Sequence, residues 1–173
     1  MSPNTPPRVP GCPYTGLARY FLTICTFNRA KRFGSPDEAS AIVAQISPFF
    51  ERRGFSVIAY CLMPDHLHLL VEGTVANADV VEATRMWKQQ TGFAWKQRTG
   101  SRLWQKGFHD RVLRTDDDTA SVVRYILENP VRAGLVRTAM DYAWLGSSRY
   151  QIAELLVHAG EWRPGWRWRR SQG

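Results

Sequence analysis

The stretch "YCLMPDHLHLLVEG", residues 60–73, carries two histidines one residue apart in an apolar run. The apolar segments on either side of Pro64 and Asp65 predict two strands joined by a tight hairpin. Alternation along the second strand places His66 and His68 side by side on one face and points Asp65 away from His66. Two adjacent imidazoles can bind one metal ion, but such a pair is equally compatible with half-buried, hydrogen-bonded structural histidines.

The length and composition of the chain predict one domain and a nucleic-acid partner. A chain of 173 residues with 44% hydrophobic content can form one core. The 23 Lys and Arg against 15 Asp and Glu give a net charge of +8, which indicates a polyanionic partner. No apolar run reaches the roughly 18 residues that span a bilayer, so we expect no membrane partner. Three cysteines without a C-x-x-C pair argue against a disulfide framework and a thiolate zinc site.

The remaining patterns predict the element order β α β β α β α. Strands are expected at residues 17–28, 55–63, 66–73 and 108–114, and helices at 35–54, 77–96 and 115–129, the second capped by Asn77. Pro48 should kink or split the first helix, and Pro130 should end the third at Asn129. This order packs as an antiparallel sheet with helices on one face, an α+β fold of the ferredoxin-like type.

The two ends of the chain differ from the central domain, which we expect at residues 17–150. Residues 1–16 are rich in proline and contain no apolar segment typical of a signal peptide, so they predict a flexible arm and a cytoplasmic protein. Residues 151–173 are expected to form a basic, Trp-rich tail, although a solvated, disordered end is the alternative.

A third metal ligand and a nucleophile are predicted from the helix at 115–129. Tyr125 and Asn129 are four residues apart and therefore share a helix face. Two imidazoles leave coordination positions open, as in a catalytic site, so Asn129 could complete a Mg²⁺ or Mn²⁺ site. Tyr125 beside that ion could attack a DNA phosphodiester, keep the 5′ phosphate and free a 3′ hydroxyl. A helical tyrosine is, however, more often a core residue.

Basic and aromatic side chains along the second half of the chain are candidates for DNA contacts, because guanidinium groups bind phosphates and rings stack on bases. They are Arg85, Lys88, Lys106, Arg111, Arg163, Arg167, Trp166 and Trp168. A charged helix face that is merely solvated is the alternative. His109 could face the site or cap the sheet edge, and Asp65 and Asp110 are candidate hydrogen-bond partners of the imidazoles.

Three motifs in this order resemble those of the HUH single-tyrosine transposases of insertion sequences, and among them the REP-associated tyrosine transposases. The motifs are "YCLMPDHLHLLVEG", "LWQKGFHDRVLR" and "VVRYILENPVRAGLV", and the resemblance covers residues 17–150. The segment "DYAWLGSSRY" is similar to a stretch common in the family, but Leu145 and Gly146 follow the Trp. We expect this departure to be a change in a loop.

The resemblance implies a ferredoxin-like sheet, a divalent metal on His66 and His68, Asn129 as third ligand and Tyr125 as nucleophile. It also implies a partner DNA that is single-stranded or folded into hairpins, such as short palindromic REP repeats. Both a monomer and a homodimer are compatible with it. Two other functions stay open, namely a non-catalytic nucleic-acid-binding module with structural histidines and a zinc hydrolase, which the absence of Asp-His after "HLH" disfavours.

Overall fold

The computed structural model describes residues 14–113 and 116–161. The elements in chain order are β1 Arg19–Cys25, the 3-10 helix η1 Phe27–Arg29, α1 Pro36–Val43, α2 Ile46–Glu51, β2 Phe55–Met63, β3 His66–Gly73, α3 Val80–Thr99, β4 His109–Leu113, α4 Asp116–Arg132, the 3-10 helix η2 Ala139–Asp141, β5 Leu145–Gly146 and α5 Ile152–Glu161. The predicted order β α β β α β α is present. The first helix is divided into α1 and α2, and the short elements η1, η2 and β5 and helix α5 are additions.

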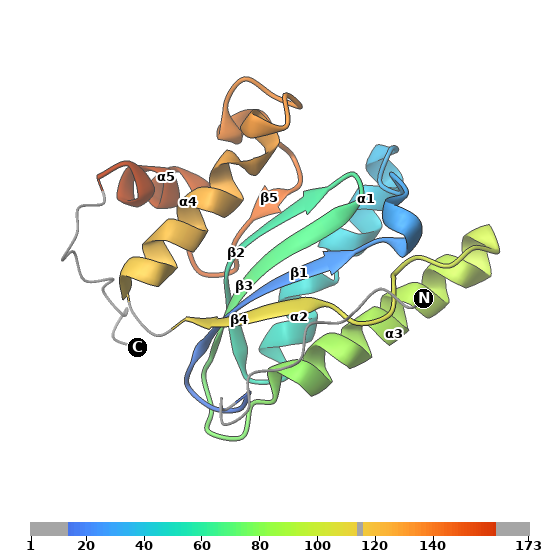
Figure 1. Cartoon of the computed structure of the whole chain (residues 1–173), viewed down its shortest axis with the longest axis horizontal. Helices are drawn as coiled ribbons and strands as arrows, with labels where there is room; N and C mark the ends of the chain where they lie inside the picture. The colour runs from blue at the N-terminus through green and yellow to red at the C-terminus, as the bar shows by residue number, and fades with distance from the viewer. Residues whose placement is uncertain (1–13, 114–115, 162–173) are drawn as a thin grey trace.

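The strands form one antiparallel sheet in the order β4-β1-β3-β2-β5 (Figure 1). The hairpin between β2 and β3 turns at Pro64 and Asp65, as predicted. β1 lies between β4 and β3, so consecutive β–α–β units interleave, which is the ferredoxin-like arrangement. The predicted α+β class is therefore confirmed, and His66 and His68 lie on a central strand of the sheet.

Helices cover both faces of this sheet (Figure 1). Alternate residues of β1 and β3 pack with α1, α2 and α3 in a first core cluster that includes Leu22, Leu69, Phe49 and Trp87. The opposite residues pack with α4 and α5 in a second cluster that includes Leu70, Val123, Ile126 and Leu155. The expected placement on one face holds for α1, α2 and α3 only. It fails for α4 because the second face of the sheet is also apolar and the helix has an apolar stripe to bury.

Prolines and caps set the helix ends differently from the prediction. The break between α1 and α2 precedes Pro48, which lies in the first turn of α2, where its missing N–H costs little. α3 is capped by Asp79 in place of Asn77, because the Asp79 carboxylate accepts a hydrogen bond from Glu82 N at 2.9 Å. α4 continues through Pro130 to Arg132 and does not end at Asn129.

The segment after α4 contains more structure than the sequence indicated. Leu145–Gly146, expected as a loop change, forms β5 on the edge of β2. Residues 152–161, assigned to the tail, form α5, whose Leu155 and Ala159 are buried in the second cluster. Among the described residues, none of the helices combines the length and apolarity needed to cross a membrane. Arg163, Arg167, Trp166 and Trp168 lie outside the described residues.

Candidate active site

The two histidines of β3 point at each other on the face covered by α4. Nε2 of His66 lies 3.0 Å from Nε2 of His68. The opposite ring nitrogens are held in place: His66 Nδ1 lies 2.6 Å from Asp65 Oδ1, and His68 Nδ1 lies 3.1 Å from Thr23 Oγ1. These outer contacts fix both rings with their Nε2 atoms directed to one point, which is how metal-binding imidazoles are oriented in proteins.

Asp65 does not point away from His66, contrary to the prediction. β3 begins at His66, so Asp65 belongs to the hairpin turn, where strand alternation does not apply. The second carboxylate oxygen of Asp65 lies 3.1 Å from Nε of Arg29, and Nη1 of the same guanidinium donates to Cys25 Sγ at 2.8 Å. The basic loop after β1 is thus tied to the histidine pair through Asp65.

Burial makes both imidazoles neutral near pH 7. Burial lowers the pKa of His66, against the opposing effect of Asp65. Burial, together with nearby His66 and Arg29, lowers the pKa of His68 to about 3. A neutral imidazole keeps the lone pair that a metal ion requires, so no proton has to be displaced from a cationic ring.

Tyr125 of α4 faces the histidine pair. Its hydroxyl lies 3.5 Å from Nε2 of His68, and its ring makes edge-to-face contacts with His68 and with Phe21 of β1 at centroid distances of 5.1 and 6.0 Å. The neighbouring Ile126 and Leu127 are buried against the sheet and hold the helix in place, while Tyr125 remains 38% exposed. A phenol and two imidazole nitrogens from distant parts of the chain therefore meet at a place that a ligand can reach.

Asn129 lies one turn after Tyr125 on α4, is partly buried, and makes no hydrogen bond through its side chain with the described residues. Within residues 14–113 and 116–161, no group of three or more His, Cys, Asp or Glu side chains is arranged to hold a metal ion. The structure brings two neutral imidazoles together, and Asn129, one helical turn after Tyr125, would add an amide oxygen. This set fits a divalent ion that keeps open positions for substrate.

The register of the sheet places two further candidates on opposite faces. His109 pairs with Thr23, and Thr23 pairs with His68, so the three side chains share one face. His109 is exposed there and faces the site side of the sheet. Asp110 pairs with Leu22 and faces the other side of the sheet. The prediction that Asp110 is a hydrogen-bond partner of the imidazoles is therefore wrong.

The basic candidates on the described residues do not form one stripe. Arg85 is ion-paired with Glu82 on the exposed side of α3. Lys88 of α3 is half-buried and donates hydrogen bonds to the carbonyl oxygens of Gln105 and Gly107. Both residues belong to the helix on the face opposite the histidines.

Lys106 is exposed in the loop before β4. Arg111 is exposed on β4, pairs with Phe21 in the sheet register, and is ion-paired with Asp118 at 2.6 Å. Of the basic candidates that the structure describes, Arg111 is the one placed by register on the histidine face. Sequence reasoning missed Thr23 and Arg29 as contacts of the site, because only the strand register brings Thr23 opposite His68.

Comparison with known families accounts for this constellation. The model of the family described as "Transposase IS200 like" matches residues 15–129, more than half of the chain, and the matched segment contains the histidine pair, Tyr125 and Asn129. The chain belongs to the IS200-like transposase family. The resemblance predicted from the motifs is thereby confirmed, and with it the expectation that this IS200-like transposase is an enzyme that nicks and joins DNA.

Individual relatives of this IS200-like transposase agree with the predicted resemblance to REP-associated tyrosine transposases. A Haemophilus influenzae protein assigned as a REP-associated tyrosine transposase is 28% identical over 162 residues, which cover 86% of this chain and 89% of the relative. The REP-associated tyrosine transposase of Escherichia coli K12 is 28% identical over 90 residues, 52% of this chain and 53% of the relative. A solved REP-associated tyrosine transposase bound to a REP hairpin shares the fold, with a TM-score of 0.64 at 22% identity over 84% of this chain and 82% of that one.

Proposed function

We propose that this IS200-like transposase cuts one strand of hairpin DNA through attack by Tyr125 and retains the DNA as a 5′-phosphotyrosine. The observation that carries the proposal is the position of the Tyr125 hydroxyl, 3.5 Å from Nε2 of His68, which is itself 3.0 Å from Nε2 of His66. A phenol is a poor nucleophile at neutral pH, since its free pKa is about 10, and it needs a neighbouring cation or base to react.

The nearby residues supply the means of activation. His66, His68 and Asn129 would hold Mg²⁺ or Mn²⁺, and a divalent ion bound there supplies positive charge to the scissile phosphate and to the phenolic oxygen. Asp65 accepts a hydrogen bond from His66 Nδ1, and Thr23 fixes the ring of His68, so both Nε2 lone pairs stay directed at the site.

The proposed reaction exchanges one phosphodiester for another. The Tyr125 oxygen loses its proton and forms a bond to phosphorus, the bond from phosphorus to the DNA 3′ oxygen breaks, and that oxygen leaves as a 3′ hydroxyl after taking up a proton. No external energy source is needed, because the bond broken and the bond formed are of the same class. The reverse attack by a 3′ hydroxyl on the phosphotyrosine rejoins DNA.

The partner proposed for this chain is hairpin DNA of the REP type. Two named relatives and a solved complex with a REP hairpin support it, as does the net charge of +8. Tyr125 and both histidines meet within a single chain, which supports a monomer as the functional unit over a homodimer with shared sites. A chromosomal DNA substrate would require access to the cytoplasm, and a cytoplasmic location is part of this proposal.

The direct test uses hairpin oligonucleotides copied from inverted repeats that flank the coding region, labelled on either side of the scissile bond. With Mg²⁺ or Mn²⁺, the label on the 3′ side should migrate with the protein on a denaturing gel, while the 5′ fragment should be released with a 3′ hydroxyl. The proposal fails if the adduct carries the 5′ fragment or if no DNA becomes attached.

One alternative has an observation in its favour. Both Nδ1 atoms already have partners in Asp65 and Thr23, and the two Nε2 atoms contact each other, as expected for structural histidines in a non-catalytic binding module. Such a module would bind the hairpin equally well with and without a chelator and form no adduct.

Asp65→Asn should weaken the response to metal without abolishing cleavage. An amide accepts a weaker hydrogen bond from His66 than a carboxylate and loses the ion pair with Arg29. We expect the Mn²⁺ concentration for half-maximal cleavage to rise by about 10- to 100-fold, with the rate restored at excess Mn²⁺. Asp110→Asn is the same change on the opposite face of the sheet, and its Mn²⁺ concentration for half-maximal cleavage should stay within about 2-fold of the wild-type value. Equal responses from the two variants would show that Asp65 does not orient His66.

A further inference from the structure

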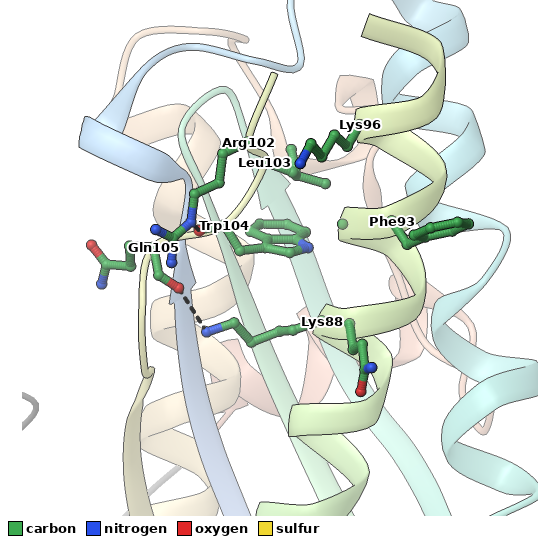
Figure 2. A pocket seen from close by; sticks show the side chains of 9 residues that line it. Lys88, Phe93, Lys96, Arg102, Leu103, Trp104 and Gln105 are labelled. Atoms are coloured by element: carbon green, nitrogen blue, oxygen red, sulfur yellow. Dashed lines mark hydrogen bonds between the residues drawn. The ribbon is translucent and has the colours of Figure 1, made fainter. Parts of the chain in front are cut away.

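A pocket of about 390 Å³ lies between α3 and the loop before β4 (Figure 2). α3 packs in the first core cluster, on the face of the sheet opposite the one that Tyr125 covers. The residues that line the pocket are Lys88, Gln89, Gly92, Phe93, Lys96, Arg102, Leu103, Trp104 and Gln105. They include three cations and no carboxylate. The volume falls in the range of roughly 300–1,000 Å³ that is common for ligand sites.

The pocket is held open by internal contacts. Lys88 donates to the carbonyl oxygens of Gln105 and Gly107 and so fixes the loop to α3. The indole N–H of Trp104 donates to Thr91 Oγ1 at 2.9 Å, which anchors the ring at the floor. Burial, with a smaller effect of nearby Arg102, lowers the pKa of Lys88 to about 8, and a bound anion would stabilise its charged form.

Lys96 and Phe93 at the rim are free to meet a ligand, whereas Arg102 Nε donates to the Trp104 carbonyl at 2.9 Å and only its terminal nitrogens remain for a phosphate. Lys96 has no hydrogen bond or ion pair with the described residues, and in Figure 2 it extends from α3 toward the side of the pocket that holds Arg102. Phe93 is 65% exposed, and its ring is turned away from Trp104. Gln89 and Phe93 also line a second hollow, together with residues of α2 and α3 such as Phe49 and Met86. An exposed ring beside cations is the combination that binds single-stranded nucleic acid.

The pocket is connected to the active site through η1. Phe27 N donates to the Leu103 carbonyl at 2.7 Å, and the Arg102 guanidinium lies 5.0 Å from the Phe27 ring centroid. At the other end of η1, Arg29 contacts Asp65, the partner of His66. η1 thus contacts the histidine pair through Arg29 and Asp65 and contacts the pocket through Phe27.

We propose that this pocket binds the single-stranded DNA that flanks the hairpin, with a phosphate between Lys96 and Arg102 and the neighbouring base stacked on Phe93. The inference rests on the proposed function in that the ligand is the same DNA. It adds a second contact site on the opposite face of the sheet, outside the groups that carry out the reaction.

The test compares binding of hairpins with and without single-stranded flanks, by fluorescence anisotropy in a chelator, so that no cleavage is required. Wild type should bind the flanked hairpin more tightly. Lys96→Gln combined with Arg102→Gln should reduce that affinity by about 10-fold or more and lower its salt slope by about 0.7, the value for one lost phosphate contact on a single strand. Phe93→Ala should also reduce the affinity for the flanked hairpin by about 10-fold. The unflanked hairpin should change by less than about 2-fold in every case.

Two further variants separate the pocket from general charge. Arg98→Gln removes one charge from the same helix, but Arg98 stacks on Trp95 outside the pocket, so it should affect both DNAs slightly and equally. Gly92→Leu should fill the space beside Trp104, because a Cβ added at residue 92 would lie 3.6 Å from the indole. Without any change of charge, this variant should lose the extra affinity that the flanks give to the hairpin. Equal losses on both DNAs, or full flank binding by Gly92→Leu, would overturn the proposal. Absence of an adduct would refute the proposed reaction but would leave this comparison intact.

Discussion

Tyr125→Phe should abolish the covalent protein–DNA adduct and leave hairpin binding within about 2-fold. The substitution removes the phenolic oxygen that lies 3.5 Å from His68 Nε2 and keeps the ring contacts with His68 and Phe21. Loss of a nucleophile has no local substitute, so we expect adduct formation to fall by on the order of 10³-fold or more. The adduct is measured on a denaturing gel under single-turnover conditions, and binding is measured separately with unlabelled competitor.

Tyr142→Phe is the matched control. The Tyr142 hydroxyl donates to the Leu62 carbonyl at 2.8 Å on the same side of the sheet, so its loss removes one structural hydrogen bond. That change should cost about 1 kcal/mol of unfolding free energy and leave adduct formation unchanged. An adduct that persists in Tyr125→Phe would refute the assignment of the nucleophile.

His68→Gln should eliminate both cleavage and metal binding. The glutamine side chain approximates the imidazole in size, which limits the cavity left among Phe21, Thr23 and Tyr125. Partners that only orient a metal-binding histidine cost 10- to 100-fold when mutated, so loss of the ligand itself should reduce cleavage by at least about 100-fold. Removal of the metal ion from the wild type with EDTA should abolish cleavage in the same way. Added Mn²⁺ should restore cleavage by the EDTA-treated wild type but not by His68→Gln.

Thermal unfolding gives a readout that does not depend on cleavage. Mn²⁺ should raise the unfolding midpoint of the wild type, because an ion that binds only the folded chain stabilises it. Tyr125→Phe keeps both histidines and should retain this shift, whereas His68→Gln should lose it. Equal stabilisation of His68→Gln by Mn²⁺ would contradict the metal assignment and favour structural histidines.

The features that could be predicted from the sequence are those set by local periodicity. The hairpin follows from Pro64 and Asp65 between two apolar segments, and the common face of His66 and His68 follows from strand alternation. The common helix face of Tyr125 and Asn129 follows from their spacing of four residues. These inferences depend on a few neighbouring residues and need no knowledge of how the elements pack.

The features that could not be predicted depend on register and on tertiary packing. The position of Thr23 opposite His68 requires the β1–β3 register, which the sequence does not specify. The predicted orientation of Asp65 was wrong because Asp65 belongs to the hairpin turn before β3, where strand alternation does not apply. The prediction that α4 would end before Pro130 was wrong, because α4 continues to Arg132 while its apolar residues pack on the second face of the sheet.

The five-stranded sheet separates two kinds of work in this molecule. The atoms that would make and break phosphodiesters gather under α4, and the surface of α3 lies behind the sheet, built from a different helix and a different core cluster. Under the proposed binding mode, substitutions on α3 would change the contacts with flanking DNA without disturbing the reacting groups. This separation would allow the DNA-binding preference of the protein to change as the repeats of a genome diverge, while the reacting groups stay the same.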